Sequence, residues 1–237
     1  MDVEARVLLI TGATGPAGRA AAARFVAEGA RVALSSRDRS SLEEVGRSLG
    51  VRRDRWLAVP GELTDGDAAR AVATTVAERW GRIDVLLHLV GGWVGGTAVL
   101  DLDHDEVRGM LDQHLWTTLH MVQAVVPGMV ERGFGRVLAV SSPFATDVRP
   151  KGASYAVGKA AEEVLLRSLA REVAGSGVTV NLVLARTIDA NHERETEPSA
   201  ENVSSTTPAE VAEALAFLAS PAAAAINGAR IPLDGRG

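Results

Sequence analysis

Two side chains in the second half of the chain have the types and the spacing needed to move a proton. Tyr155 and Lys159 are four residues apart in a segment rich in Ala, Glu, Leu and Arg, which predicts a helix with both side chains on one face. A free tyrosine has a pKa near ~10, and a nearby ammonium group lowers such a value because it favours the phenolate. This pair could therefore exchange a proton with an oxygen that gains or loses charge, which is typically worth about 10²–10⁴ in rate.

A serine upstream could bind the same oxygen. Ser142 ends an apolar run that begins at Arg136, and this run predicts a buried parallel strand. The serine hydroxyl would then lie at the carboxyl end of the strand, where open α/β sheets bind their ligands. We therefore predict Ser142, Tyr155 and Lys159 as catalytic residues, with Ser142 and Tyr155 also contacting the substrate.

A glycine-rich turn near the N-terminus has the composition of a phosphate-binding loop. Gly12, Gly15 and Gly18 lie between the apolar run Val7–Ile10 and an Ala-rich segment that predicts a helix. Glycine lets the backbone approach a phosphate closely, and the N-terminus of the following helix supplies N–H donors. We predict that this turn, including Thr14, holds the pyrophosphate of a dinucleotide. Together with the proton-transfer residues, it indicates an enzyme that transfers hydride.

The residues after the second predicted strand bear on which dinucleotide binds. An acid there would accept from the ribose 2′-hydroxyl and favour NAD, whereas an arginine accommodates the 2′-phosphate of NADP. The chain has Ser36 and Arg37 at this point, with Arg39 close by. We therefore expect NADP(H) to be preferred and NAD(H) to be possible. The alternative is that Arg37 only begins a solvated helix.

Together these motifs resemble the classical-size members of the short-chain dehydrogenase/reductase family, and the similarity covers nearly the whole chain. The Ser…Tyr-x-x-x-Lys arrangement of that family matches Ser142, Tyr155 and Lys159, and Asn227–Gly235 resembles its last strand and following turn. The resemblance implies an NAD or NADP cofactor and a homodimer or homotetramer built on the long helices. The further cofactor contacts that it implies are Glu62, Leu63, Gly91, Tyr155, Lys159 and Ile188.

A more local resemblance is to quinoid dihydropteridine reductase and its bacterial relatives. It covers Val90–Gly96, Gln113–Trp116 and Thr187–Asn191. The first of these segments contains Trp93, which we predict as a wall of the substrate pocket. The alternative is a tryptophan that only packs.

Three motifs depart from the pattern of the family. The Asn-Asn-Ala-Gly after its fourth strand is His88–Gly91 here, its helix Asn is His114, and its Pro-Gly after the sixth strand is Ala185-Arg186. We predict His114 as a catalytic proton carrier, because free histidine titrates near neutral pH; a packed structural histidine is the alternative. His88 is predicted to be structural. Arg186 would contact a phosphate or an anionic substrate, or form a surface ion pair.

The elements that must position these residues are predicted from hydrophobic pattern. Strands alternate with helices, which predicts one α/β domain over residues 1–237: a Rossmann-like, doubly wound parallel sheet of about seven strands with helices on both faces. We expect strands at Ala5–Ile10, Arg31–Ser35, Trp56–Val59, Val85–Val90, Val137–Ser141, Val178–Val183 and Ala229–Leu233. Helices are expected from the glycine turn to Glu28 and at Ser41–Leu49, Gly66–Trp80, Asp105–Arg132, Ala156–Gly175 and Pro208–Ala219.

One stretch, Asn191–Thr207, is polar, acidic and rich in Ser and Thr. Such a composition is typical of a surface loop. Because it follows the carboxyl end of a predicted strand, we predict that residues 191–207 form a mobile lid over the substrate.

Composition excludes several other classes of function. The net charge of −5 gives no basic excess for nucleic acid and no polybasic patch for a membrane. The apolar runs are too short to span a bilayer, and the first residues lead into a strand rather than a signal peptide. The absence of cysteine and of HExxH-type histidine spacing gives no reason to expect a metal, and we expect a cytoplasmic enzyme acting on a small molecule.

These observations favour an NAD(P)H-dependent reductase of carbonyl or imine groups. Two alternatives stay open at this point. The altered motifs at His88, His114 and Ala185-Arg186 would also fit a non-redox enzyme on the same fold, such as a cyclase or dehydratase. The G-x-x-G-x-x-G spacing would fit a regulator that senses a nucleotide, although a sensor has no need for Ser142 and Tyr155.

Overall fold

The computed structural model describes residues 6–200 and 202–234. Seven parallel strands form one sheet in the order β3-β2-β1-β4-β5-β6-β7. The chain builds the sheet outward from β1 to β3 on one side and outward from β4 to β7 on the other, so the switch point of the sheet lies between β1 and β4. The strands are β1 (Val7–Thr11), β2 (Arg31–Ser35), β3 (Trp56–Ala58), β4 (Val85–His88), β5 (Gly135–Ser141), β6 (Val178–Leu184) and β7 (Arg230–Pro232). The predicted doubly wound parallel sheet is confirmed.

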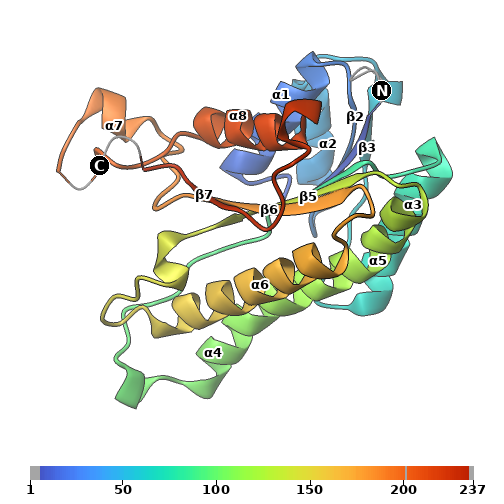
Figure 1. The fold of residues 1–237 in the computed structure, drawn as a ribbon. Helices are drawn as coiled ribbons and strands as arrows, with labels where there is room; N and C mark the ends of the chain where they lie inside the picture. The colour runs from blue at the N-terminus through green and yellow to red at the C-terminus, as the bar shows by residue number, and fades with distance from the viewer. Residues whose placement is uncertain (1–5, 201, 235–237) are drawn as a thin grey trace.

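Helices cover both faces of the sheet (Figure 1). One face carries α1 (Pro16–Ala27), α2 (Arg39–Ser48) and α8 (Pro208–Ala219). The other face is covered by α3 (Gly66–Trp80), α5 (Thr117–Glu131) and α6 (Ala153–Glu172). The remaining helices are α4 (His104–Leu111) and the short α7 (Glu193–Thr196), and 3₁₀ turns occur at Arg53–Arg55, Val99–Asp101, Pro143–Ala145 and Pro221–Ala223.

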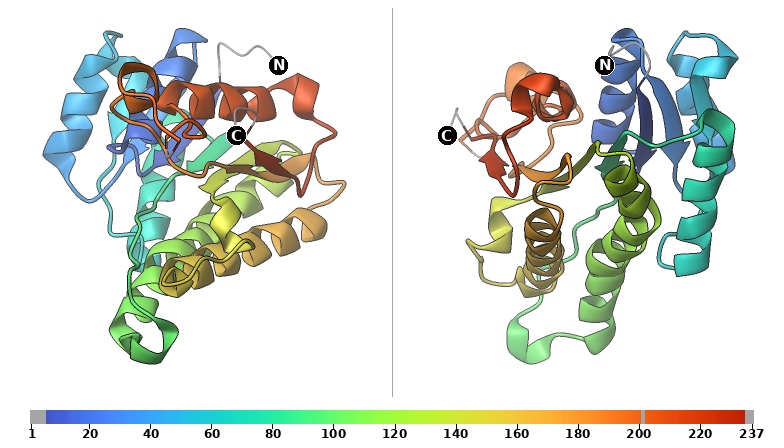
Figure 2. Two further views of the ribbon diagram at one scale, coloured as in Figure 1. Left: turned by 90° about the vertical axis from the view of Figure 1, so that its left-hand side faces the viewer. Right: turned by 45° about the vertical axis from the view of Figure 1, so that its right-hand side comes forward.

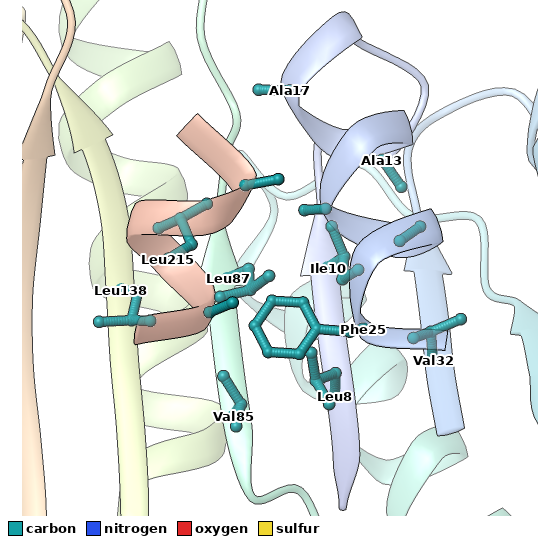
Figure 3. Packing of buried hydrophobic residues seen from close by; sticks show 14 of the residues in the cluster. Leu8, Ile10, Ala13, Ala17, Phe25, Val32, Val85, Leu87, Leu138 and Leu215 are labelled. Carbon is teal, nitrogen blue, oxygen red and sulfur yellow. The ribbon is translucent and has the colours of Figure 1, made fainter. Parts of the chain in front are cut away.

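Alternation along the strands divides the core into two clusters. Successive side chains of a strand point to opposite faces, so Leu8 and Ile10 of β1 enter one cluster while Val7 and Leu9 enter the other. In the first cluster the ring of Phe25 from α1 lies among Leu8, Ile10 and the side chains of β4 (Figure 3). Both faces of the sheet are thus buried, which explains the nearly continuous apolar runs of its strands.

The boundaries of the predicted elements lie within three residues of the observed ones, with two differences in kind. The short helix α7 lies in the stretch 191–207, which was predicted as a loop. The helix expected over Asp105–Arg132 is two helices, α4 and α5, joined by a π-helical turn at Asp112–Trp116. A π turn adds one residue to a helical turn and is often found at functional sites. The helix expected from Ala156 begins three residues earlier, so Tyr155 lies in the first turn of α6. Ala5, at the start of the first predicted strand, lies outside the described residues.

After β4 the chain runs as an extended segment to α4, which lies at one end of the molecule (Figure 2). This segment, residues 89–103, contains Trp93. None of the helices in the described part of the chain is long and apolar enough to cross a lipid bilayer.

The buried side chain of His88 connects β4 with β1 and α5. The Nδ1 atom of His88, at the end of β4, is 2.9 Å from Thr11 Oγ1, and its Nε2 atom is 3.2 Å from Thr117 Oγ1. The Thr117 hydroxyl donates to the Gln113 carbonyl at 2.6 Å, so it accepts from His88, and Nε2 carries the proton. Both ring nitrogens have partners, as expected of a structural histidine.

Burial, with a smaller contribution from Lys159, lowers the pKa of His88 to about 3. The unfolded chain binds a proton to this histidine at a higher pH than the native protein does, so its contribution is complete above pH ~6.5 and is lost as the pH falls towards 3.

We therefore predict that acid destabilises the native protein more than a variant without this histidine. Between pH 7 and pH 5 the free energy of unfolding of the native protein should fall by about 2 kcal/mol more than that of His88→Gln. Urea unfolding at both pH values measures the difference. Equal losses in the two proteins would show that His88 is not held neutral.

Candidate active site

Two adjoining cavities lie along the carboxyl ends of the strands. They share Gly12, Gly15 and residues 89–91 as common lining. The first cavity extends to the end of β2, and the predicted cofactor residues that line it are Gly12, Thr14, Gly15, Arg37, Glu62, Leu63 and Gly91. The second extends to α6, and the predicted residues that line it are Gly12, Gly15, Gly18, Gly91, Trp93, Tyr155, Lys159 and Ile188. Residues from distant parts of the sequence thus meet in one groove at the switch point of the sheet.

The glycines of the first turn fit a closely bound phosphate group. Gly12 has a φ of +67°, and a Cβ there would lie 2.3 Å from the Leu89 carbonyl oxygen. A Cβ on Gly18 would lie 2.5 Å from the Gly12 carbonyl oxygen, whereas Gly15 has 3.4 Å to its nearest neighbour. The backbone is therefore packed tightly behind the turn and open in front of Gly15, which is the cradle that a pyrophosphate needs.

Helix α1 begins directly at this turn. Gly15 is its N-cap residue, makes no side-chain cap, and is followed by Pro16 in the first turn. Proline has no N–H, so the donors left at this helix end are the following backbone amides. Proline suits the first turn of a helix, so Pro16 is compatible with a helix that begins at this glycine turn.

At the other end of the groove, Ser36 and Arg37 line the first cavity beside Glu62. An acid does follow Arg37 directly: the Asp38 side chain accepts from the backbone N–H groups of Ser40 and Ser41 and caps α2. Because this carboxylate caps the helix and does not line the cavity as described, the charged side chain at this point of the cavity lining is the Arg37 guanidinium.

Tyr155 and Lys159 both lie on α6, one helical turn apart, and their role in proton transfer stays a prediction. Tyr155 and Lys159 line the second cavity together. Lys159 is almost fully buried, and its Nζ atom donates to the Val140 carbonyl at 2.8 Å and to Glu162 Oε2 at 2.8 Å. A buried ammonium requires such partners, because removing it from water is costly.

The predicted substrate-binding serine, Ser142, does not line either of the two cavities as described. It is buried directly after β5, and its hydroxyl accepts from the Phe144 backbone N–H at 3.3 Å. Of the two serines, it is Ser141 that lines the second cavity in the described part of the chain, while its hydroxyl donates to Glu163 Oε1 at 2.7 Å. Contact between Ser142 and a substrate stays a prediction.

His114 lies in the π turn next to Tyr155, with ring centroids 5.7 Å apart in an edge-to-face arrangement. Close packing makes this possible, because a Cβ on Gly158 would be 2.8 Å from the Met110 carbonyl oxygen. His114 Nε2 donates to the Gly92 carbonyl at 3.2 Å, which leaves Nδ1 as a buried acceptor with no partner among the described residues.

The expectation that His114 titrates near neutral pH is wrong. Burial, with Lys159 adding to it, lowers the pKa of His114 to about 3, so this histidine is neutral at pH 7. Any part it plays in catalysis is that of a neutral hydrogen-bonding group. Sequence spacing alone could not reveal this, because burial and the neighbouring cation depend on the tertiary structure.

The predicted Trp93 lines the groove together with three residues that the sequence analysis did not single out, Phe144, Arg149 and Lys151. Trp93 is 64% exposed and lines both the second cavity and a smaller one formed with Phe144, Arg149, Lys151 and Tyr155. The Arg149 guanidinium lies 4.3 Å from the centre of the Phe144 ring. Residues 149–151 lie just before α6 in the sequence, so their closeness to Tyr155 along the chain could have indicated that they line the site.

Arg186 also lines the second cavity and donates to the Ser204 hydroxyl. The segment 191–207 has two anchors. The carboxylate of Asp189 accepts from the backbone of Glu193 and Arg194 at 2.9 Å, and Arg194 pairs with Glu210 of α8 at 2.9 Å.

Known proteins resemble this chain over almost its whole length. A family model described as enoyl-(acyl carrier protein) reductase matches residues 12–235. The 3-oxoacyl-[acyl-carrier-protein] reductase FabG of Vibrio cholerae is 30% identical, and the match covers 99% of this chain and 98% of that protein. Meso-2,3-butanediol dehydrogenase of Serratia marcescens is 32% identical, with 99% of this chain and 95% of that protein covered.

A solved structure agrees with this grouping. The 3-ketoacyl-(acyl-carrier-protein) reductase from Brucella melitensis, complexed with NADH, matches with a TM-score of 0.87 at 25% identity over 97% of each chain. The likeness to quinoid dihydropteridine reductase stays a prediction. By its cavity residues and its relatives, the chain belongs to the classical short-chain dehydrogenase/reductase family and is an NAD(P)H-dependent oxidoreductase of carbonyl or alcohol groups.

Proposed function

We propose that the protein is an NADPH-preferring reductase of small carbonyl compounds in which Tyr155 donates the proton. The observation that carries this proposal is that Tyr155 and Lys159 line the same cavity as the Gly12–Gly18 cradle. The nicotinamide cofactor, when bound, supplies the hydride. An imine substrate would use the same arrangement, since an imine nitrogen needs the same proton.

The residues of the chain divide the remaining work. The Tyr155 hydroxyl gives its proton to the substrate oxygen as that oxygen gains charge. Lys159 sits one helical turn further along α6, where it binds the nicotinamide ribose. Ser142 would contact the substrate oxygen after turning its hydroxyl away from the Phe144 N–H, and neutral His114 would accept a hydrogen bond at Nδ1.

The walls of the substrate side favour a particular kind of molecule. Trp93 and Phe144 offer aromatic surface, and Arg149 and Lys151 offer positive charge with no acidic residue in the lining of that cavity. We propose that a carbonyl compound with a flat or acyl body and an anionic group fits best.

The groove between α5 and α6 supports a proposal about oligomeric state, because its lining includes Val122, Val126, Leu165 and Leu169. We propose that a second copy of the chain covers it in a homodimer or homotetramer. The protein is proposed to work in the cytoplasm.

Replacing Tyr155 should separate chemistry from binding. We expect Tyr155→Phe to reduce the rate of NADPH oxidation with diacetyl or acetoacetyl-CoA by about 10² or more, because the proton donor is lost. NADPH binding, followed by its fluorescence, should persist. A variant that keeps more than about a tenth of the rate would remove Tyr155 as the acid.

Arg37 should determine the choice of cofactor. We expect Arg37→Asp to weaken NADPH binding relative to NADH by about tenfold or more, since a charge-assisted hydrogen bond to the 2′-phosphate is lost and a repulsion gained. Arg39→Asp is the matched control, because Arg39 belongs to α2 and does not line the cavity as described. Fluorescence titration with both cofactors measures the ratio. Equal affinity of the native protein for NADPH and NADH would contradict the proposal.

We further propose that residues 191–207 act as a lid, held at its start by Asp189 and Arg194 and at its end by the buried residues 205–207. Residues 195–200 between them are exposed, so this part should open locally at little cost. Hydrogen exchange should be fast there in the free protein and slow once NADPH and a substrate are both present. Strong protection in the free protein would mean that the segment is a fixed wall.

A further inference from the structure

The carboxylate of Glu162 is in contact with the ammonium group of Lys159. Its side chain is fully buried, three residues after Lys159 on α6, and Oε2 is 2.8 Å from Lys159 Nζ. The Thr118 hydroxyl of α5 is 3.5 Å from the other oxygen, Oε1. A buried carboxylate needs such partners, because removing an unpaired charge from water costs a large free energy.

A second buried acid follows immediately but has different partners. Glu163 accepts from the Ser141 hydroxyl at 2.7 Å and pairs with Arg230 of β7 at 2.7 Å. The two buried acids of α6 are therefore each matched with one cation. Glu162 belongs to Lys159, and Glu163 belongs to Arg230.

Two histidines also lie within the influence of the Lys159 charge, His88 at the end of β4 and His114 in the π turn. Burial, with Lys159 adding to it, lowers the pKa of each to about 3, so both are neutral at pH 7. From β5, the Val140 carbonyl contributes a dipole at 2.8 Å. Burial raises the pKa of Glu162, while the adjacent ammonium of Lys159 opposes this and favours the ionised form. The short contact between Nζ and Oε2 is that of a charged pair.

We propose that Glu162 is a positioning residue that compensates the charge of Lys159 and thereby keeps Tyr155 protonated, which sets the site for carbonyl reduction. An isolated ammonium would stabilise the tyrosine phenolate. Paired with a carboxylate, it presents a dipole, whose effect on a neighbouring group is much weaker than that of a full charge.

This inference rests on the proposed function. In the reduction, the carbonyl carbon receives the hydride of NADPH with its electron pair, and the carbonyl oxygen receives the Tyr155 proton. The products are the alcohol and NADP⁺, and solvent then restores the proton of the phenolate. Tyr155 must therefore enter each turnover protonated, and Glu162 supports that state.

The composition of the chain allows a direct test. Tyr155 is the single tyrosine in the sequence, so the absorbance change of phenolate formation in the free protein reports this residue alone, with Tyr155→Phe as the blank. We expect Glu162→Gln to lower the pH of half-ionisation of Tyr155 by about one unit, because the charge of Lys159 is then uncompensated. Glu163→Gln is the matched control and should move it by less than about a third as much.

The result that would overturn the proposal is equally clear. A Glu162→Gln protein whose Tyr155 ionises at the same or a higher pH than in the native protein would show that Glu162 does not act on it. A shift of equal size in Glu163→Gln would show that any buried negative charge on α6 has this effect, which also contradicts the specific pairing.

A second set of variants applies if Glu162→Gln does not fold. Lys159→Met should raise the pH of half-ionisation, whereas Lys159→Met/Glu162→Leu, which removes both charges, should raise it by less than half as much. Equal shifts in these two proteins would overturn the proposal. Since this titration needs no cofactor or substrate, it gives an answer even if the reductase activity itself is not found.

The holoenzyme provides the second readout. With NADPH and diacetyl for reduction, and NADP⁺ and acetoin for oxidation, Glu162→Gln should move the pH profile of kcat in both directions to lower pH by about one unit, because reduction needs the phenol of Tyr155 and oxidation needs its phenolate. Unchanged pH profiles together with an unchanged titration refute the role of Glu162 but leave Tyr155 as the donor. Failure of Tyr155→Phe to lose activity would instead refute the proposed function.

Discussion

The buried ammonium group of Lys159 is the interaction on which the rest of the site depends. Because it is removed from water, it must be held by oxygen atoms, and these come from the end of β5 at Val140 and from Glu162 on α6 itself. The contact with Val140 fixes α6 against the sheet, and Tyr155, one turn earlier, is thereby placed in the cavity. The same positive charge helps to keep His88 and His114 neutral. One buried cation thus sets both the geometry and the protonation of its surroundings.

Close backbone approach is the second requirement, and glycine residues meet it at two places along the groove. Gly12 and Gly18 allow the first turn to pack against Leu89 and against itself, which opens the cradle at the start of α1. Gly158 allows α6 to contact Met110, which brings the π turn and His114 next to Tyr155. A side chain at any of these positions would separate elements whose contact forms the groove. The parallel sheet then brings both places together, because the strands all end at one edge.

Much of this could be predicted from the sequence, because local patterns report local structure. The bounds of α3 and α8 agree with the predictions at both ends, since Asp65 and Thr207 cap them and the apolar period is regular. The π turn was missed, because no side chain marks an extra residue in a helix. The neutrality of His114 and the pairing of Glu162 were missed for a related reason. Both depend on burial and on neighbours that only the folded chain brings together.

The central claim is that one dinucleotide spans the groove from Arg37 to Tyr155. A crystal structure of the protein with NADP⁺ tests it most directly. We expect the pyrophosphate over the Gly12–Gly18 turn, the 2′-phosphate beside Arg37, and the nicotinamide ribose within hydrogen-bond distance of Tyr155 and Lys159. A nucleotide whose nicotinamide end lies away from Tyr155, or a groove that stays empty at saturating NADP⁺, would contradict the account.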